Sequence, residues 1–171
     1  MIRRTTGATG RTARGRAQGQ RHDHRGCIED ALKRAELVCS SRSANLTEIR
    51  RRVLELVWRG HEPIGAYEIL DALGQAGVRA QPPTVYRALE FLIAQGLVHR
   101  VESRNAFIGC AQPDERHGYQ FLICRDCGTV EELSDRRIGL AVSAGAKAAG
   151  FAVGRSTVEV EGVCARCRDA A

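Results

Sequence analysis

Four cysteines near the C-terminus form two pairs with the same spacing, Cys124-Arg-Asp-Cys127 and Cys164-Ala-Arg-Cys167, separated by 36 residues. Two residues between cysteines allow a tight turn to present both thiolates to one metal ion. Four soft thiolates in a tetrahedron suit zinc, which has no redox chemistry of its own. The spacing therefore predicts one zinc site shared by both pairs.

The alternative is that these are two redox-active or simply buried cysteine pairs. A redox pair normally begins a helix in a βαβ unit, whereas Cys124 follows the strand-like run 119–123. Gly128 and Gly162 lie beside the pairs, where the chain is expected to turn tightly. The shared zinc site is the favoured interpretation.

A second set of metal-ligand residues surrounds a predicted β-hairpin. His99 and Cys110 lie symmetrically about a polar turn whose midpoint falls between Arg104 and Asn105. If the hairpin is centred there, the two residues face each other with Cβ atoms about 4.5–5.5 Å apart, which one metal ion can bridge.

Three further candidate ligands follow the hairpin in the sequence. His117 lies in the segment after it, and Glu131 and Glu132 come shortly after Cys127. Nitrogen, sulfur and carboxylate ligands together make a mixed set that zinc accepts. Because a single strand histidine or cysteine is usually just packed or exposed, that interpretation stays open for each residue alone.

Composition limits the classes of function. The 171-residue chain carries a formal net charge of +6, which favours a polyanionic partner. It has neither an apolar run long enough to span a membrane nor an N-terminal secretory signal, so we expect a cytoplasmic protein with no membrane partner. Paired cysteines in that setting indicate metal binding. The absence of a nucleophile–base pair or phosphate loop predicts no enzyme activity and no small-molecule substrate.

The hydrophobic pattern predicts an α+β protein: an N-terminal winged helix-turn-helix followed by a small α+β domain with the four-cysteine zinc knuckles. A capping box at Asn45 and Glu48 is expected to begin the second helix. The last domain is expected to contain strands at 119–124, 129–133 and 157–161, with a helix at 135–149. The predicted divisions are a disordered basic tail at 1–25, a DNA-binding domain including the hairpin at 26–110, and a dimerisation and metal-binding domain at 111–171.

Several motifs together resemble one family. The run Pro-Pro-Thr-Val-Tyr-Arg-Ala-Leu at 82–89 and Gly-Leu-Val-His at 96–99 resemble the recognition helix and hinge of the ferric uptake regulator family. The segments 121–128 and 162–167 are similar to that family's structural zinc knuckles. The resemblance covers about residues 30–167. Within the family, the chain most resembles members that respond to zinc, because histidine-rich runs of the iron- and peroxide-sensing members are missing near His117.

The resemblance implies a homodimeric, zinc-responsive repressor of zinc-uptake genes that binds palindromic double-stranded operator DNA when its regulatory zinc site is filled. It implies two zinc ions per protomer. The structural zinc would be held by Cys124, Cys127, Cys164 and Cys167, and the regulatory zinc by His99, Cys110, His117 and Glu132. Glu131 is the less favoured acid, because the family's glutamate lies five residues after the second knuckle cysteine. The rival class is a zinc-containing thiol redox sensor or chaperone.

Expected DNA contacts lie on two helices of the N-terminal domain. Tyr86 and Arg87 are the expected base-facing residues, and Tyr67 and Thr84 the expected phosphate or base-edge contacts. The structural alternatives are that Tyr67 belongs to the core and that Arg87 is a solvated surface residue. Cys27 and Cys39 lie on one predicted helix and are expected to be packed thiols. A site made of His22, His24 and Cys27 is the weaker alternative.

Overall fold

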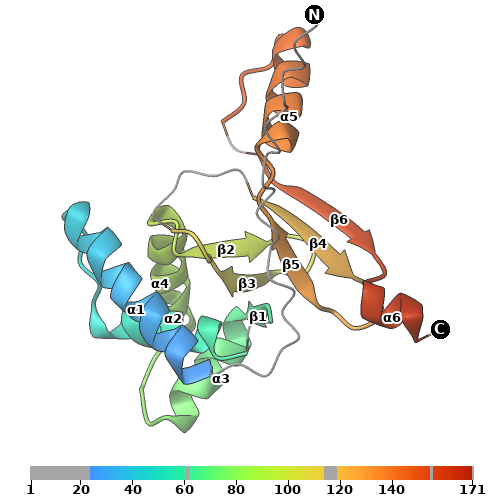
Figure 1. The fold of residues 1–171 in the computed structure, drawn as a ribbon. Coiled ribbons are helices and arrows are strands. Elements are labelled where there is room, and N and C mark those ends of the chain that lie inside the picture. Colours follow the sequence, from blue (N-terminus) through green and yellow to red (C-terminus); the bar gives the residue numbers. More distant parts are fainter. Residues whose placement is uncertain (1–23, 61, 114–118, 155, 171) are drawn as a thin grey trace, which may run out of the picture.

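The computed structural model describes residues 24–60, 62–113, 119–154 and 156–170 (Figure 1). The predicted basic tail at 1–25 lies outside this range except for its last two residues, which are already helical because α1 begins at His24. None of the described helices is long and apolar enough to cross a bilayer.

Four helices build the N-terminal part: α1 (His24–Ser41), α2 (Glu48–Trp58), α3 (Ala66–Gln75) and α4 (Pro82–Ala94). Each turns an apolar stripe inward, and α4 shows why these positions were predictable. Val85, Ala88, Leu89 and Leu92 recur at helical spacing and are buried. The helix begins at two prolines, which cost no hydrogen bond in a first turn.

The predicted capping box of α2 is wrong. Thr47 occupies the N-cap position and makes no side-chain cap hydrogen bond. The Glu48 carboxylate accepts a hydrogen bond from Arg52 Nε at 2.9 Å instead of reaching back to the chain before the helix. A forward i,i+4 ion pair has replaced the expected backward contact.

The N-terminal part also contains a three-stranded sheet, with strand order β1 (Ile64–Gly65), β3 (Ala106–Gly109) and β2 (Val98–Val101). β1 lies between α2 and α3 in the sequence, and β2 and β3 follow α4. The two-residue strand β1 was not predicted because it is too short to show an alternating pattern. β2 and β3 form the predicted hairpin, which we call the wing.

The predicted register of the wing is wrong by two residues. His99 lies opposite Ile108, not Cys110, and the N–H of Cys110 donates to the carbonyl of Leu97 at 3.0 Å. The loop between the strands is 102–105, where Asn105 takes a left-handed conformation (φ 47°). A shift of two residues keeps every side chain on its original face of the sheet, so His99 and Cys110 still share one face.

The C-terminal part is a second three-stranded sheet of order β5 (Val130–Leu133), β4 (Gln120–Cys124) and β6 (Val158–Gly162). β4 runs antiparallel to β5 and parallel to β6. The helix α5 (Arg136–Ala148) lies between β5 and β6 in the sequence and extends away from the rest of the molecule in Figure 1. A short unpredicted helix, α6 (Ala165–Asp169), follows β6.

The wing packs directly against the second sheet. Val101 and Ile108 of the wing form one buried cluster with Phe121, Ile123 and Val130, separate from the core of the four helices. Phe121 is fully buried there. The protein is thus an α+β winged helix whose wing has a second sheet as its support, which confirms the predicted fold class.

Gly109 generates a prediction, because it lies under the ring of Trp58 and directly before Cys110. A Cβ at this position would lie 2.3 Å from Trp58 Cε2, so Gly109→Ala must displace a rigid ring or the strand. We expect the free energy of unfolding in urea to fall by about 1–3 kcal/mol. The fluorescence of Trp58, the only tryptophan, should shift as well.

The matched control is Gly74→Ala in α3, where an added Cβ meets no atom within 4 Å. It should be neutral or stabilising by up to about 1 kcal/mol. Equal stability of the two variants would contradict the close approach of Trp58 to the wing.

Candidate metal centres and nucleic-acid interface

The parallel pairing of β4 with β6 brings the two cysteine pairs together. Cys124 ends β4 opposite Gly162 at the end of β6, and Cys164 follows as the N-cap of α6. The Sγ atoms of Cys124, Cys127, Cys164 and Cys167 all lie within 4.8 Å of one another. We call this group the thiol cage.

The cage has the dimensions of a zinc site. The Sγ atoms of Cys127 and Cys164 are 3.7 Å apart. A tetrahedron with Zn–S bonds of about 2.3 Å has edges of about 3.8 Å. The four cysteines therefore fit a zinc ion, which supports the predicted ligand set.

Backbone groups hold the first pair in a tight turn. Gly128 takes a positive φ of 74°, and its N–H donates to the carbonyl of Cys124 at 2.9 Å. The N–H of Cys164 donates to Cys124 Sγ at 3.3 Å, which ties the two pairs together. Gly162 is not a turn residue as predicted, since it lies within β6 and pairs with Cys124.

Hydrogen bonds shift the pKa values of two thiols of the cage in opposite directions. A hydrogen bond with the Thr129 side chain, at 3.2 Å, is the largest cause that lowers the pKa of Cys127 to about 5. Hydrogen bonding to Cys127 is the largest cause that raises the pKa of Cys167 to about 12. Bonding to Cys127 also raises the pKa of the Arg166 guanidinium. The cage thus favours negative charge at Cys127, and thiolates are the form in which cysteine binds metal.

The argument from secondary structure against redox-active cysteine pairs holds for the first pair but not for the second. Cys164 begins the helix α6 after a strand that is parallel to β4, which is the setting in which redox pairs occur. Cys124 and Cys127 instead lie at the end of a strand and in the turn after it, as predicted. Convergence of all four thiols, and not the helix argument, favours the metal site.

The second predicted ligand set gathers at the contact between the wing and the second sheet. His99 from β2, Cys110 after β3 and Glu132 from β5 place ligand atoms within 4.8 Å of one another. His99 Nε2 lies 3.7 Å from Glu132 Oε1, a separation that one zinc ion with bonds of about 2.0–2.2 Å can span. His99 and Cys110 are 5% and 3% exposed, so this mixed site is shielded from water.

Strand pairing explains why Glu132, and not Glu131, lies at the mixed site. Glu132 pairs with the buried Phe121, whereas Glu131 pairs with the exposed Leu122 on the opposite face of the sheet. Glu131 therefore points away from the mixed site. His117, the fourth predicted ligand, lies outside the described residues.

Two neighbours of the ligand sets were missed in the sequence. The ring of Tyr119 lies against that of His99, with centroids 3.7 Å apart, and helps to orient it. Tyr119 could have been found, because it is two residues from Phe121 and so shares its face. Thr129, which bonds to Cys127, carries no signal in the sequence that marks it as part of the cage.

The predicted DNA-contacting residues are all exposed. Thr84, Tyr86 and Arg87 lie on the outer face of α4, where Tyr86 is 40% exposed. Tyr67 on α3 is 67% exposed, so the alternative that it belongs to the core is wrong. Cys39 is buried, as expected for a packed thiol, and Cys27 is half-buried. His22 and the His24 side chain lie outside the description.

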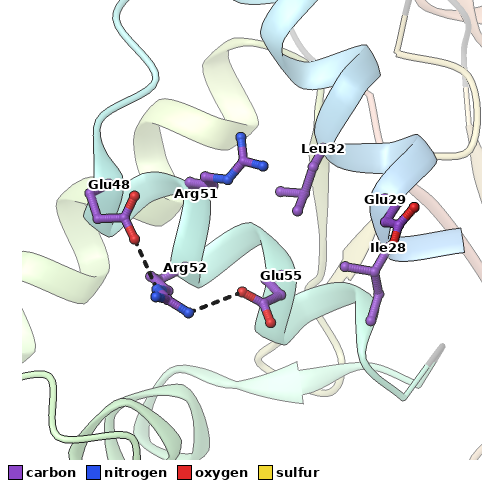
Figure 2. Close-up of a pocket in the computed structure, with 7 residues that line it drawn as sticks. All are labelled: Ile28, Glu29, Leu32, Glu48, Arg51, Arg52 and Glu55. Atoms are coloured by element: carbon purple, nitrogen blue, oxygen red, sulfur yellow. Dashed lines mark hydrogen bonds and ion pairs between the residues drawn. The ribbon is translucent and has the colours of Figure 1, made fainter. Parts of the chain in front are cut away.

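A cavity of about 360 Å³ lies between α1 and α2, away from both ligand sets (Figure 2). In it Arg52 bridges Glu48 and Glu55 at 2.9 and 3.6 Å. These charges compensate one another along one face of α2, so the cavity is explained by helix packing and surface ion pairs.

The model of the "Ferric uptake regulator family" matches residues 41–161. The chain is 39% identical over 140 residues to the "Zinc uptake regulation protein" of Escherichia coli (strain K12), covering 81% of this chain and 82% of that protein. It is 30% identical over 106 residues to the protein of the same name in Mycobacterium tuberculosis, covering 60% of this chain and 78% of that one.

Solved structures of zinc uptake regulators are also similar to this chain. A zinc uptake regulator complexed with zinc and DNA superimposes with a TM-score of 0.80 at 38% identity, covering 84% of this chain and 96% of that chain. The crystal structure of holo XcZur gives 0.76 at 44% identity, covering 82% and 98%. The arrangement of a winged helix with a wing-supporting sheet defines a class of DNA-binding regulators. The chain belongs to the ferric uptake regulator family.

The cage generates a prediction with a matched control. Cys127→Ser removes a thiol whose pKa is lowered in the cage, so the variant should lose one tightly held zinc per protomer, unfold at a lower temperature and lose the expected dimer. Metal content, thermal unfolding and sedimentation measure these three effects. Cys27→Ser, which changes a half-buried thiol on α1, should keep all three properties. A stable, dimeric Cys127→Ser protein with unchanged zinc content would defeat the assignment.

Proposed function

We propose that the protein is a zinc-responsive transcriptional repressor of zinc-uptake genes. The observation that carries the proposal is the mixed site, whose ligands come from two parts of the molecule. His99 lies in the wing, Cys110 directly follows it, and Glu132 lies in the second sheet. The names of the relatives, zinc uptake regulation proteins, and a structural neighbour bound to zinc and DNA support the same function.

In this proposal the mixed site senses zinc and the thiol cage maintains the fold, giving two zinc ions per protomer. Bound zinc supplies coordination bonds that tie His99, Cys110 and Glu132, with His117 as fourth ligand, into one unit. The chain supplies the rest: the buried imidazole is oriented by Tyr119, and the apolar cluster around Phe121 excludes water. Filling the site restricts the wing and α4 to one orientation and raises the population that can bind DNA.

The proposed DNA contact is the outer face of α4 in the major groove. Tyr86 and Arg87 face the bases, and Thr84 and Tyr67 contact phosphates or base edges. The exposure of these four side chains supports this role. In this proposal the protein acts in the cytoplasm, where it binds DNA, and it has neither an enzyme activity nor a small-molecule substrate.

The proposed active form is a homodimer built by the C-terminal part. α5 has no buried residue, although apolar side chains occupy part of its surface. Apolar side chains are also exposed on the outer face of the second sheet and after α5. Together, the exposed apolar side chains of the second sheet, of α5 and of the segment after α5 are Leu122, Leu133, Leu140, Val142, Phe151, Val153 and Val160. A second copy of the chain would cover this surface, which is consistent with a division into domains at 26–110 and 111–171.

Base recognition by α4 can be tested with Arg87→Ala. If Arg87 is bidentate to guanine, affinity for a palindromic operator should fall by about 1–3 kcal/mol and preference should relax at one base position per half-site. Gel shifts on an operator series measure both. Arg168→Ala at the C-terminal end of α6 removes the same charge away from α4 and should leave the base preference intact. Unchanged preference in Arg87→Ala would mean that α4 does not read this base.

Sensing can be separated from folding with Cys110→Ser. This variant should remain folded and dimeric, keep one zinc per protomer and bind operator weakly at any zinc concentration. In the wild type, zinc should strengthen DNA binding about 5- to 150-fold, and operator should tighten zinc binding by the same factor. Zinc titrations with and without operator measure the coupling. Equal zinc affinities in the wild type would show that this metal does not switch the protein.

A further inference from the structure

The wing is attached to the second sheet at a place that neither ligand set explains. The carboxylate of Glu159, on β6, accepts hydrogen bonds from two consecutive backbone N–H groups of the wing loop. Glu102 N donates to Oε1 at 2.6 Å and Ser103 N donates to Oε2 at 3.0 Å. The two partners lie more than 50 residues from Glu159 in the sequence, so this contact joins separate parts of the molecule.

Glu159 lies in one row of residues across the second sheet. Phe121 at the centre of β4 pairs with Glu132 of β5 on one side and with Glu159 of β6 on the other. Paired residues of neighbouring strands point to the same face, so the row presents a carboxylate, an aromatic ring and a second carboxylate to the wing.

Strand β2 of the wing runs along this row. His99, in β2, lies beside Glu132 and has its ring 6.0 Å from that of Phe121. Val101 at the end of β2 packs in the Phe121 cluster. Glu102 and Ser103, which come next, bind Glu159. The wing thus contacts the row at three points, and the mixed metal site is only one of them.

We propose that Glu159 is a positioning residue for the zinc response. Its hydrogen bonds hold the wing loop (102–105) on the second sheet, so that at the other end of β2 His99 already lies beside Glu132 when zinc binds. The inference rests on the proposed function, since the response is that of a zinc-dependent DNA-binding protein. A metal ion alone would hold one end of the strand and leave the loop free to pivot about the Phe121 cluster.

A carboxylate suits this position better than any neutral side chain. Burial would raise the pKa of Glu159, but hydrogen bonds from Ser103 and from the Glu102 N–H outweigh it and hold the pKa below its ordinary value. The group is therefore ionised at neutral pH and offers two acceptor oxygens to two donors. A glutamine of the same shape offers one oxygen and turns an NH₂ donor toward the second N–H.

The experiment compares Glu159→Gln with Glu161→Gln. Glu161 lies two residues along β6 on the same face, and its side chain makes no hydrogen bond or ion pair among the described residues, so it is a matched control for charge and shape. Zinc affinity of the mixed site is measured by chelator competition without DNA, and operator affinity at saturating zinc. Metal content of the cage and melting temperature are the checks of the fold.

Glu159→Gln should bind zinc at the mixed site about tenfold more weakly while the cage zinc, the dimer and the melting temperature stay at control values. Glu161→Gln should match the wild type. A side chain that only stabilised the fold would lower the melting temperature and leave zinc affinity unchanged. Equal zinc affinity in the two variants would overturn the proposal.

A second measurement covers the case in which Glu159→Gln folds poorly. In the wild-type protein, hydrogen exchange of the amides at 102 and 103 should be slow compared with that of the exposed residue Arg104, with or without zinc at the mixed site. Fast exchange at both positions would overturn the proposal. If zinc has no effect on operator binding by the wild type, the proposed function fails instead, whatever the exchange at these amides.

Discussion

The packing of the wing on the row Glu132–Phe121–Glu159 is the contact on which the other features depend. Each sheet is only three strands wide: the first has β1 and β2 at its edges, and the second has β5 and β6. Neither can bury both of its faces alone. By sharing the cluster around Phe121, the two sheets obtain a common core. The same contact encloses His99 and Cys110, so the mixed site inherits its low exposure from packing that the cluster already provides.

Local features of this architecture could be predicted from the sequence. The two prolines before Val85, the helical spacing of Val85, Leu89 and Leu92, and the equal cysteine spacings all depend on residues close together in the chain. The predictions of the α2 capping box and of the hairpin register were wrong, because each depended on the contacts of a few atoms. Glu48 pairs with Arg52 and not with the chain before α2, and the hairpin loop is centred one residue before the predicted midpoint between Arg104 and Asn105. The register error of two residues left His99 and Cys110 on the same face of the sheet, because an even shift does not change the face of any side chain.

Features made by long-range pairing could not be predicted in the same way. The alternation of 157–161 indicated a strand and placed Glu159 and Glu161 on one face, but no pattern in the sequence says which of them meets the wing. That choice follows from the register of β6 against β4, which places Glu159 beside Phe121. The same register brings Cys124 to Gly162 and so closes the thiol cage. One parallel strand pair thus determines both the cage and the far end of the wing contact.

The origins of their ligands give the two proposed metal sites different properties. The cage is assembled by β4, β6 and the turns that follow them, so no movement between wing and second sheet is needed to form it. The mixed site forms only when the wing lies on the second sheet. Any free energy needed to bring the wing there is subtracted from its affinity for zinc. Its zinc affinity therefore depends on the packing of Phe121 and the hydrogen bonds of the wing loop as well as on the ligands. Substitutions at this contact can change the zinc concentration of the response while every ligand stays in place.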